Sequence, residues 1–191
     1  MTVTASTMLP LGTPAPPFAL PDPAGTTVSS DDLAHAPALL VMFLCNHCPY
    51  VRHVRRGLAE VVRDLQARGV AVVGVNSNDA GAYADDRPER MAEVAAEVGY
   101  SFPFLVDESQ VVAAAYRAAC TPDFFLFDRD RRLAYRGQMD GSRPGNDVAV
   151  TGDDLQAAAE AVLAGQPVPE PQRPSIGCDI KWRPGNRPDY A

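Results

Sequence analysis

The sequence predicts one α/β domain with a mixed central sheet flanked by helices, and three features of the chain support this. Residues 38–44 and 70–75 are apolar runs without alternation, which is typical of strands buried on both faces of a sheet. Between them, apolar residues recur at helical spacing over 51–65, so strand, helix and strand form one right-handed crossover unit. Further along, residues 124–127 and 133–136 flank a turn and predict an antiparallel hairpin.

An N-terminal extension precedes the first buried run. Residues 1–10 are rich in threonine, proline and small side chains, and we expect a flexible arm there. Residues 18–28 surround a Pro/Gly turn and predict a β-hairpin. Ser29, with Asp32 three residues later, predicts a capped helical turn. We therefore place the domain at residues 11–165, with the hairpin as its N-terminal addition.

The second half of the chain predicts shorter elements. After a polar loop, apolar residues at helical spacing over 91–98 predict a helix, residues 102–106 a short strand, and residues 110–118 another helix. Thr151 and Asp154 are expected to cap a final helix, which ends at Gly165. Residues 166–191 are Pro-rich, and we expect an irregular tail that packs on the domain.

Charge and hydropathy limit the partners. The formal net charge of −7 argues against nucleic acid, because phosphate binding needs a basic surface. No run approaches the roughly 18 apolar residues needed to cross a bilayer, so we expect no membrane partner. Residues 1–11 lack the basic start and continuous apolar stretch of a secretory signal, so a cytoplasmic location is expected.

Two of the four cysteines form a Cys-x-x-Cys motif, Cys45-Asn46-His47-Cys48, between a buried run and a long helix. The first turn of a helix offers free N–H groups and about half a positive charge, which together lower a thiol pKa. His47 would add to this effect when protonated. The first cysteine of such a turn usually points outward, so we predict Cys45 as the nucleophile and Cys48 as the resolving thiol.

A structural or metal-binding role is the alternative for this pair. A four-cysteine zinc site normally shows two close pairs, and this sequence has one. A site made of His47 and both cysteines would need a fourth ligand from Cys178 or His53. We therefore expect no bound metal and no cofactor, and we expect redox chemistry in a reducing compartment.

Three blocks of sequence together resemble a known family: FLCNHCPY at residues 43–50, TPDFFLFD at 121–128 and SIGCDIKW at 175–182. They are similar to the peroxiredoxin-like redoxins of the thioredoxin superfamily, often labelled as relatives of alkyl hydroperoxide reductase or thiol-specific antioxidant. The similarity covers the chain from about Leu11 to Trp182. It implies a thioredoxin-like fold and thiol redox activity.

The resemblance also gives a role to Thr121 and Pro122. In thioredoxin-like proteins a cis proline faces the cysteine pair and presents backbone polar groups to the substrate. Pro122 directly precedes the strand predicted at 124–127, which is where that fold has its cis proline. We therefore expect a cis Thr121–Pro122 bond beside the cysteine motif, although cis is only about 5% of X–Pro bonds.

The sequence departs from both better-known relatives. A true peroxiredoxin carries Pro-x-x-x-Thr-x-x-Cys, and aligning its cysteine on Cys48 puts Val41 and Cys45 in place of the proline and threonine. The arginine that peroxiredoxins place before a later strand is replaced by the Thr121–Pro122 segment. Both elements that position a peroxide are missing, which disfavours a peroxidase.

Classical thioredoxins have Trp before the first cysteine, Gly-Pro within the motif and a buried Asp upstream. Here those positions hold Leu44, Asn46-His47 and Leu39, so the sequence identifies no proton acceptor for the resolving cysteine. Histidine inside the motif resembles the more oxidising members of the superfamily. We expect a reduction potential above the roughly −270 mV of thioredoxin.

Cys120 and Cys178 are possible additional redox residues. Cys120 lies two residues before the expected cis proline, and an inert buried cysteine is the alternative reading there. For Cys178 we hypothesise that the tail folds back, so that this thiol exchanges with Cys45 or pairs with Cys120. The alternative is a tail residue packed beside Ile180 and Trp182.

The leading function is therefore a thiol–disulfide oxidoreductase that acts on protein or small-molecule disulfides. Its electron donor would be a thiol system of the thioredoxin or glutathione type. A thiol-dependent peroxidase is the second hypothesis, and a non-catalytic binding or metal-holding module is the third.

Overall fold

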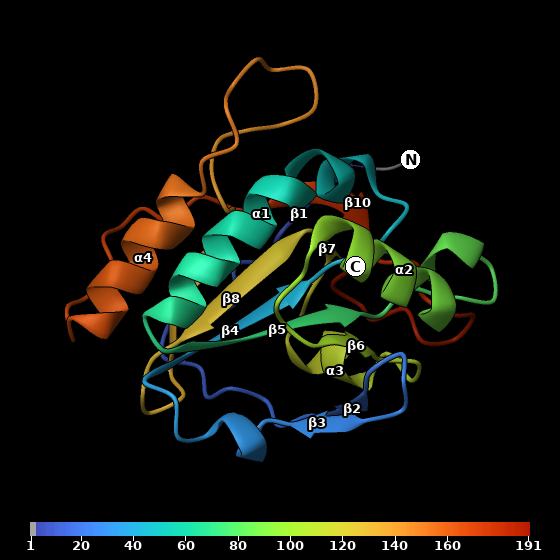
Figure 1. The fold of residues 1–191 in the computed structure, drawn as a ribbon, viewed down its shortest axis with the longest axis horizontal. Helices are drawn as coiled ribbons and strands as arrows, with labels where there is room; N and C mark the ends of the chain where they lie inside the picture. Colours follow the sequence, from blue (N-terminus) through green and yellow to red (C-terminus); the bar gives the residue numbers. More distant parts are fainter. Residues whose placement is uncertain (1–2) are drawn as a thin grey trace.

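The centre of the computed structural model, which describes residues 3–191, is a five-stranded sheet (Figure 1). Its strands are β4 (Ala38–Phe43), β5 (Val70–Asn76), β6 (Phe104–Val106), β8 (Asp123–Phe127) and β9 (Leu133–Gly137). They follow the order β6-β5-β4-β8-β9, in which β4, β5 and β6 are parallel and β8 is antiparallel to both neighbours. The predicted mixed sheet is confirmed, and every residue of β4 is buried, as its unbroken apolar run requires.

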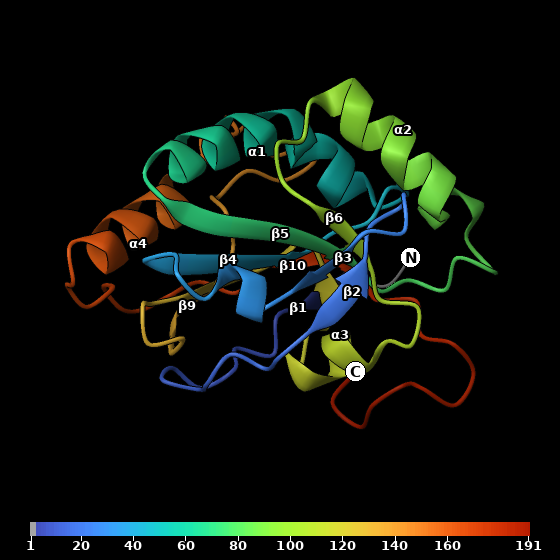
Figure 2. The same cartoon turned by 60° about the horizontal axis from the view of Figure 1, so that its bottom comes forward.

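Helices and a hairpin cover the two faces of this sheet. α1 (Pro49–Ala67), α2 (Pro88–Val98) and α4 (Asp153–Leu163) lie on one face, and the short α3 (Val111–Ala115) lies on the other (Figure 2). Alternate residues of β4 pack into the two resulting cores. Leu40 and Met42 belong to the core under α1, whereas Leu39 and Val41 belong to the opposite core. Within residues 3–191, no helix is both long and apolar enough to span a bilayer.

The N-terminal hairpin has the predicted form. β2 (Ala19–Pro21) pairs antiparallel with β3 (Thr27–Ser29), and a 3-10 helix, η1 (Asp31–Leu33), follows. The Ser29 hydroxyl donates to the Asp32 carboxylate at 2.7 Å, and the same carboxylate accepts from the Ser29 N–H at 2.9 Å. These contacts close the turn that the spacing of the two residues predicts.

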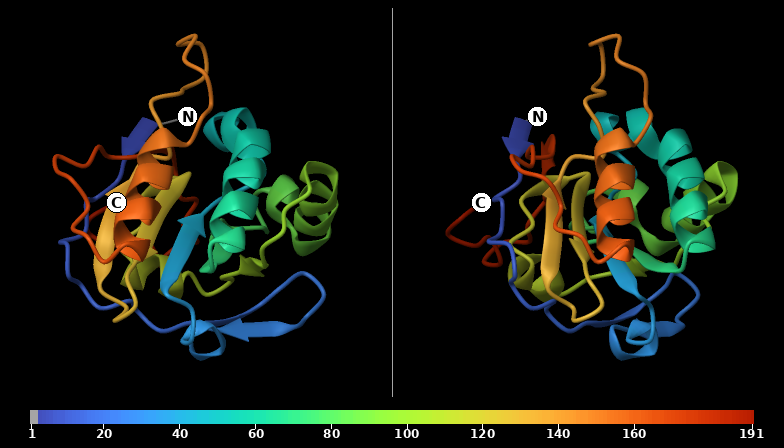
Figure 3. Two further views of the ribbon diagram at one scale, coloured as in Figure 1. Left: turned by 60° about the vertical axis from the view of Figure 1, so that its left-hand side comes forward. Right: turned by 90° about the vertical axis from the view of Figure 1, so that its left-hand side faces the viewer.

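The ends of the chain are more ordered than the sequence predicts. β1 (Val3–Ala5), β10 (Ile176–Asp179) and β7 (Cys120–Thr121) form a second sheet in the order β1-β10-β7, so the two terminal segments lie side by side (Figure 3). We expected a flexible arm over residues 1–10 and an irregular tail over 166–191, but both segments contain a paired strand. Each strand finds its partner far away in the chain, which local composition does not reveal. Residues 1 and 2 lie outside the described residues.

The start of α4 also differs from the prediction. The N-cap is Gly152, in a left-handed conformation with φ 72°, and as a glycine it has no side chain to cap the helix. The carboxylate of Asp140 instead accepts from the N–H groups of Thr151 and Gly152, at 2.9 and 2.7 Å. The Thr151 hydroxyl also accepts from the Asp153 N–H at 3.4 Å, so Thr151 contributes to the helix start as predicted. The Asp154 carboxylate accepts from Gln138 instead of capping the helix. Gly165, with φ 67°, follows the end of the helix as predicted.

Candidate active site

The cysteine motif connects the end of β4 to the start of α1. α1 begins at Pro49, and Cys48 is its N-cap, with φ −68° and ψ 125°. Proline at the first helical position is preorganised for the helix and loses no hydrogen bond there, which fixes the start of α1 after Cys48 rather than at Cys45. Both cysteines are buried, with 1% of Cys45 and none of Cys48 exposed. The predicted position between a buried strand and a long helix is confirmed.

The Thr121–Pro122 bond is cis, as predicted, and Thr121 meets both sulfurs. Its hydroxyl Oγ1 lies 3.2 Å from the Cys45 Sγ, and its carbonyl oxygen accepts from the Cys48 Sγ at 3.2 Å. Residues from β7 and from the start of α1, more than seventy positions apart in sequence, are thus joined around one pair of thiols.

Cys48, not Cys45, is the more acidic thiol. A hydrogen bond from Cys45 lowers the pKa of Cys48 most, and it acts against the cost of burial. Bonds from Cys178 and from the Val51 N–H add to it, so the pKa of Cys48 falls to about 5. The Val51 N–H is one of the free donors of the first helical turn. The bond from the Cys48 sulfur to the Thr121 carbonyl belongs to the protonated form of Cys48.

The pKa of Cys45 shifts in the opposite direction to that of Cys48. Burial raises the pKa of Cys45 well above its usual value, and the pairing with Cys48 and the negative charge of Asp86 raise it further. The Thr121 hydroxyl lowers it by a smaller amount. Because α1 begins at Pro49, the free N–H groups of its first turn lie nearer to Cys48 than to Cys45. The roles predicted for the two cysteines stay predictions, which the pH dependence of alkylation tests.

Alkylation of the reduced protein should report this order of acidity. We expect the rate at Cys48 to rise between about pH 4 and about pH 6 and then to stay flat to neutral pH, since the thiolate is the reactive form. Cys45 should react only at alkaline pH. Treatment with iodoacetamide at a series of pH values, followed by peptide mass spectrometry, measures both profiles. A Cys48 midpoint near the roughly 8.5 of a free thiol contradicts the assignment.

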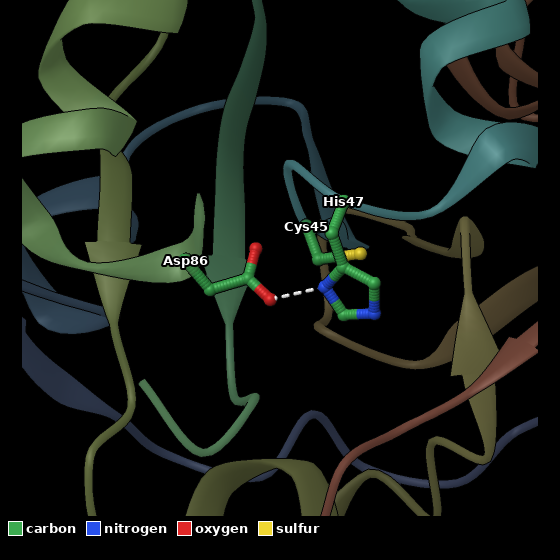
Figure 4. A group of neighbouring side chains, drawn as sticks. All are labelled: Cys45, His47 and Asp86. Atoms are coloured by element: carbon green, nitrogen blue, oxygen red, sulfur yellow. Dashed lines mark hydrogen bonds and ion pairs between the residues drawn. The ribbon is translucent and has the colours of Figure 1, made fainter. Parts of the chain in front are cut away.

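A histidine–carboxylate pair lies beside Cys45 (Figure 4). His47 Nδ1 bonds Asp86 Oδ2 at 2.5 Å, and the imidazole stacks on Tyr83 with ring centroids 4.7 Å apart. The Cys45 sulfur, a His47 ring nitrogen and an Asp86 oxygen all lie within 4.8 Å of one another. Asp86 comes from a 3-10 helix, η2 (Ala84–Asp86), after β5. Sequence reasoning missed it, because it lies in a polar loop that looks like an exposed turn.

Asp86 is held as an anion by the groups around it. Burial raises the pKa of Asp86, but hydrogen bonds from His47, the Asn46 N–H and Asn78 together lower it by more, so the net shift is downward. The Asn46 N–H donates to Asp86 at 2.7 Å, and the Asn78 amide donates at 2.9 Å. Asn46 therefore connects the cysteine loop to Asp86 and contributes by position rather than by contact with a sulfur.

Cys45, His47 and Asp86 are also the residues of this site whose ligand atoms lie close enough for a metal ion. Three protein ligands suit a catalytic zinc ion with an open position, whereas a structural zinc site needs four. Asp86 already bonds His47, so both could bind one ion only after that bond breaks. The arrangement fits a proton relay to Cys45 better than a metal centre.

The remaining two cysteines lie on opposite faces of β7 and β10. Cys178 is paired with Thr121, whereas Cys120 is paired with Asp179. The Cys120 sulfur approaches the carbonyl oxygens of Pro122 and Ser175 at 3.7 and 4.0 Å. Burial raises the pKa of Cys120 well above its usual value, and the nearby Asp123 raises it further. The structure thus brings Cys178 to the cysteine pair. Cys120 is a buried, protonated thiol whose pKa is also raised by the charges of Cys48 and Cys178, and its sulfur contacts backbone carbonyls.

A protein family matches more than half of this chain. The AhpC/TSA family matches residues 11–136. Among proteins with curated descriptions, none is significantly similar to this chain.

Three solved structures illustrate the similarity. An uncharacterized conserved protein from Geobacillus kaustophilus is 53% identical, with a TM-score of 0.94 over 97% of this chain and 98% of the other. A hypothetical protein from Sinorhizobium meliloti is 51% identical, with the same TM-score of 0.94 over 95% of this chain and 100% of the other. The thioredoxin domain of a thiol-disulfide oxidoreductase from Bacteroides vulgatus shares the fold at 22% identity, with a TM-score of 0.62 over 81% and 99% of the two chains.

The family match spans most of the chain, and the sheet order, the cis proline and the position of the cysteine motif are those expected of a thioredoxin fold. The chain therefore belongs to the AhpC/TSA family and has a thioredoxin-like fold.

Proposed function

We propose that this protein is a thiol–disulfide oxidoreductase that cycles between a Cys45–Cys48 dithiol and the corresponding disulfide. The observation that carries the proposal is the placement of an acidic thiol, Cys48, at a helix start, with a second thiol hydrogen-bonded to it. The Cys48 thiolate attacks a substrate disulfide, forms a mixed disulfide and releases one substrate thiolate. Cys45 then loses its proton and attacks the Cys48 sulfur, which releases the second thiolate. The substrate gains two electrons, and the pair loses two.

The test is the rate at which a model disulfide oxidises the reduced protein. Reduced wild-type protein should be oxidised by 2-hydroxyethyl disulfide far faster than a free thiol is, with two thiols released per chain. Rapid quenching and mass spectrometry measure both quantities. If wild-type protein reacts no faster than an unfolded cysteine peptide, the proposed function is rejected.

A thiol-dependent peroxidase is the second candidate, and one observation favours it. Cys48 occupies the position at which the peroxiredoxin signature has its peroxide-attacking cysteine, and it is the acidic thiol. In that reaction the Cys48 thiolate takes one peroxide oxygen and becomes a sulfenic acid, which Cys45 converts to the disulfide with loss of water. Stopped-flow reaction with hydrogen peroxide separates the candidates, since a disulfide exchanger should react with peroxide only at the rate of an ordinary thiolate.

The proton of Cys45 needs an acceptor, and the His47–Asp86 pair supports that role. His47 Nε2 is buried and has no hydrogen-bond partner among the described residues, so it is available to take a proton. Asp86 bonds Nδ1 of the same ring and fixes its orientation. We expect Asp86→Asn to slow the resolving step about 10-fold to 100-fold at neutral pH.

The pH profile distinguishes this role from a structural one. In Asp86→Asn the loss should shrink at alkaline pH, where Cys45 ionises without help. A loss that is equal at all pH values contradicts proton transfer. Asp85→Asn is the matched control, since Asp85 is half-exposed and pairs with Arg52 at the surface. Single-turnover rates of disulfide closure across the pH range measure both variants.

The burial of both sulfurs limits the size of the disulfide that can reach them. Neither sulfur is open to solvent, and the backbone of Thr121 is already paired with β10. We therefore propose small-molecule disulfides as the favoured oxidants, with a thiol system of the thioredoxin or glutathione type as the donor. A reducing, cytoplasmic setting fits four cysteines that form no disulfide scaffold.

A further inference from the structure

Strand pairing places a third thiol beside the cysteine pair. In the ladder of β10 and β7, Cys178 lies directly opposite Thr121, and residues opposite each other in an antiparallel pair have their side chains on the same face. The Thr121 hydroxyl points at the Cys45 sulfur, so this is the face of the active site. Cys178 belongs to the same buried core as Cys45 and Cys48, and only 3% of it is exposed.

The strand that carries Cys178 is firmly docked. β10 is paired on one side with β1 and on the other with β7, and it lies against α1. Directly after it, the Ile180 N–H donates to the Ala119 carbonyl at 3.1 Å, and the Lys181 N–H donates to the Asn78 side-chain oxygen at 2.8 Å. The position of the Cys178 sulfur is therefore set by backbone pairing on both sides of the residue.

We propose that Cys178 is a third redox thiol of this site, which resolves an oxidised Cys48 by forming a Cys48–Cys178 disulfide. The inference rests on the proposed function, because it needs Cys48 to be the sulfur that a substrate oxidises. It differs from the sequence-based hypotheses for Cys178, exchange with Cys45 or pairing with Cys120, in naming Cys48 as the partner. The register of β10 and β7 favours Cys48 over Cys120, because Cys178 is paired with Thr121 and Cys120 with Asp179.

The chemistry balances by two routes. When Cys48 carries a mixed disulfide, Cys178 gives up its proton and its thiolate attacks the Cys48 sulfur. The substrate half leaves as a thiolate and takes a proton, so Cys48 and Cys178 together lose two electrons. When the Cys45–Cys48 disulfide is already formed, the same attack expels Cys45 as a thiolate that takes the proton. That second route moves the disulfide without net oxidation.

The electrostatics of Cys178 fit a thiol that acts only after Cys48 is oxidised. Burial raises the pKa of Cys178, and its hydrogen bond to the Cys48 thiolate raises it further, to about 12. Oxidation of Cys48 removes that negative charge and that bond. Lys181, which lowers the pKa of Cys178, stays in place. The reduced site therefore keeps Cys178 protonated, and the oxidised site makes it a better nucleophile.

The test uses the full chain with Cys45→Ser, which removes the competing resolving thiol. The reduced variant is treated with 2-hydroxyethyl disulfide, quenched with acid and mapped by peptide mass spectrometry. We expect a Cys48–Cys178 disulfide as the main product, with two thiols released per chain. In the double variant Cys45→Ser/Cys178→Ser, the mixed disulfide at Cys48 should persist at least about tenfold longer. Cys45→Ser/Cys120→Ser is the matched control and should behave like Cys45→Ser.

The outcomes separate this inference from the proposed function. The role of Cys178 is overturned if the Cys48 mixed disulfide persists as long in Cys45→Ser as in the double variant. The proposed function still stands in that case, provided that the wild-type protein exchanges disulfides. If the wild-type protein shows no disulfide exchange, the proposed function is rejected instead. Thermal unfolding monitored by circular dichroism checks that each variant folds, and Cys45→Ala replaces any serine variant that does not. A Cys48–Cys178 peptide from partly oxidised wild-type protein supports the inference without any substitution.

Discussion

Cys48→Ser should slow the first exchange step at least about 1,000-fold, whereas Cys45→Ser should leave that step within about tenfold of wild type. The reason is the distribution of hydrogen-bond donors. Cys48 receives bonds from two thiols and from a free N–H of the first helical turn, so it is the sulfur that is ionised at neutral pH. Cys45 is protonated there, because burial and the charge of Asp86 both disfavour its thiolate.

The measurement is the rate at which the first substrate thiol is released in a single turnover with 2-hydroxyethyl disulfide. Cys120→Ser is a suitable control, since it removes a buried thiol that lies outside the active-site face and should change the rate little. If Cys45→Ser slows the release of the first substrate thiol more than Cys48→Ser does, Cys45 is the attacking thiol. The roles expected from the sequence motif would then hold, and the acidity assigned from the structure would be wrong.

Much of the fold follows from local pattern. The apolar runs that form β4 and β5 have no polar interruptions, because both faces of these strands are buried. The periodic segment between them forms α1, since one helical face packs on the sheet. The cis Thr121–Pro122 bond was predicted from its place before β8, together with the family resemblance.

The features that sequence reasoning missed depend on distant partners. β1 and β10 are short, and each pairs with a strand that lies far away in the chain. Asp86 reaches the cysteine loop only because the segment after β5 turns back over it, which no local spacing encodes.

The order of acidity within the cysteine pair is different, because the sequence itself carries a signal for it. Pro49 marks the first position of α1 and makes Cys48 the N-cap. The Cys-x-x-Cys motif is usually interpreted by analogy, with its first cysteine as the nucleophile. The proline that follows the motif indicates that the helix starts after the second cysteine. The electrostatic consequence then follows from the position of the free N–H groups.

Gly177→Ala should lower the free energy of unfolding by about 2–4 kcal/mol, or release β10 from its sheet. A Cβ atom at Gly177 would lie 1.9 Å from the Thr121 carbonyl oxygen and 2.6 Å from its carbon. Both are backbone atoms next to the cis proline, so no side chain can rotate away to relieve the overlap. Only a glycine allows β10 to approach β7 this closely, and the two strands must separate when a methyl group is added.

Urea denaturation measures the change in stability, and Gly141→Ala is the matched control. A Cβ atom at Gly141 would meet nothing within 4 Å, so that variant should unfold within about 0.5 kcal/mol of wild type. An equal, small effect of both substitutions would mean that β10 is not docked as described.

The same substitution separates the two disulfides of the site. Cys45 and Cys48 both belong to the segment before α1, so Gly177→Ala should leave the Cys45–Cys48 disulfide able to form. Cys178 is carried by the displaced strand, and in Cys45→Ser/Gly177→Ala the yield of the Cys48–Cys178 disulfide should fall at least about tenfold relative to Cys45→Ser/Gly141→Ala. An unchanged yield would show that the third thiol reaches Cys48 without the pairing of β10 and β7, and the backbone register could not be what positions it.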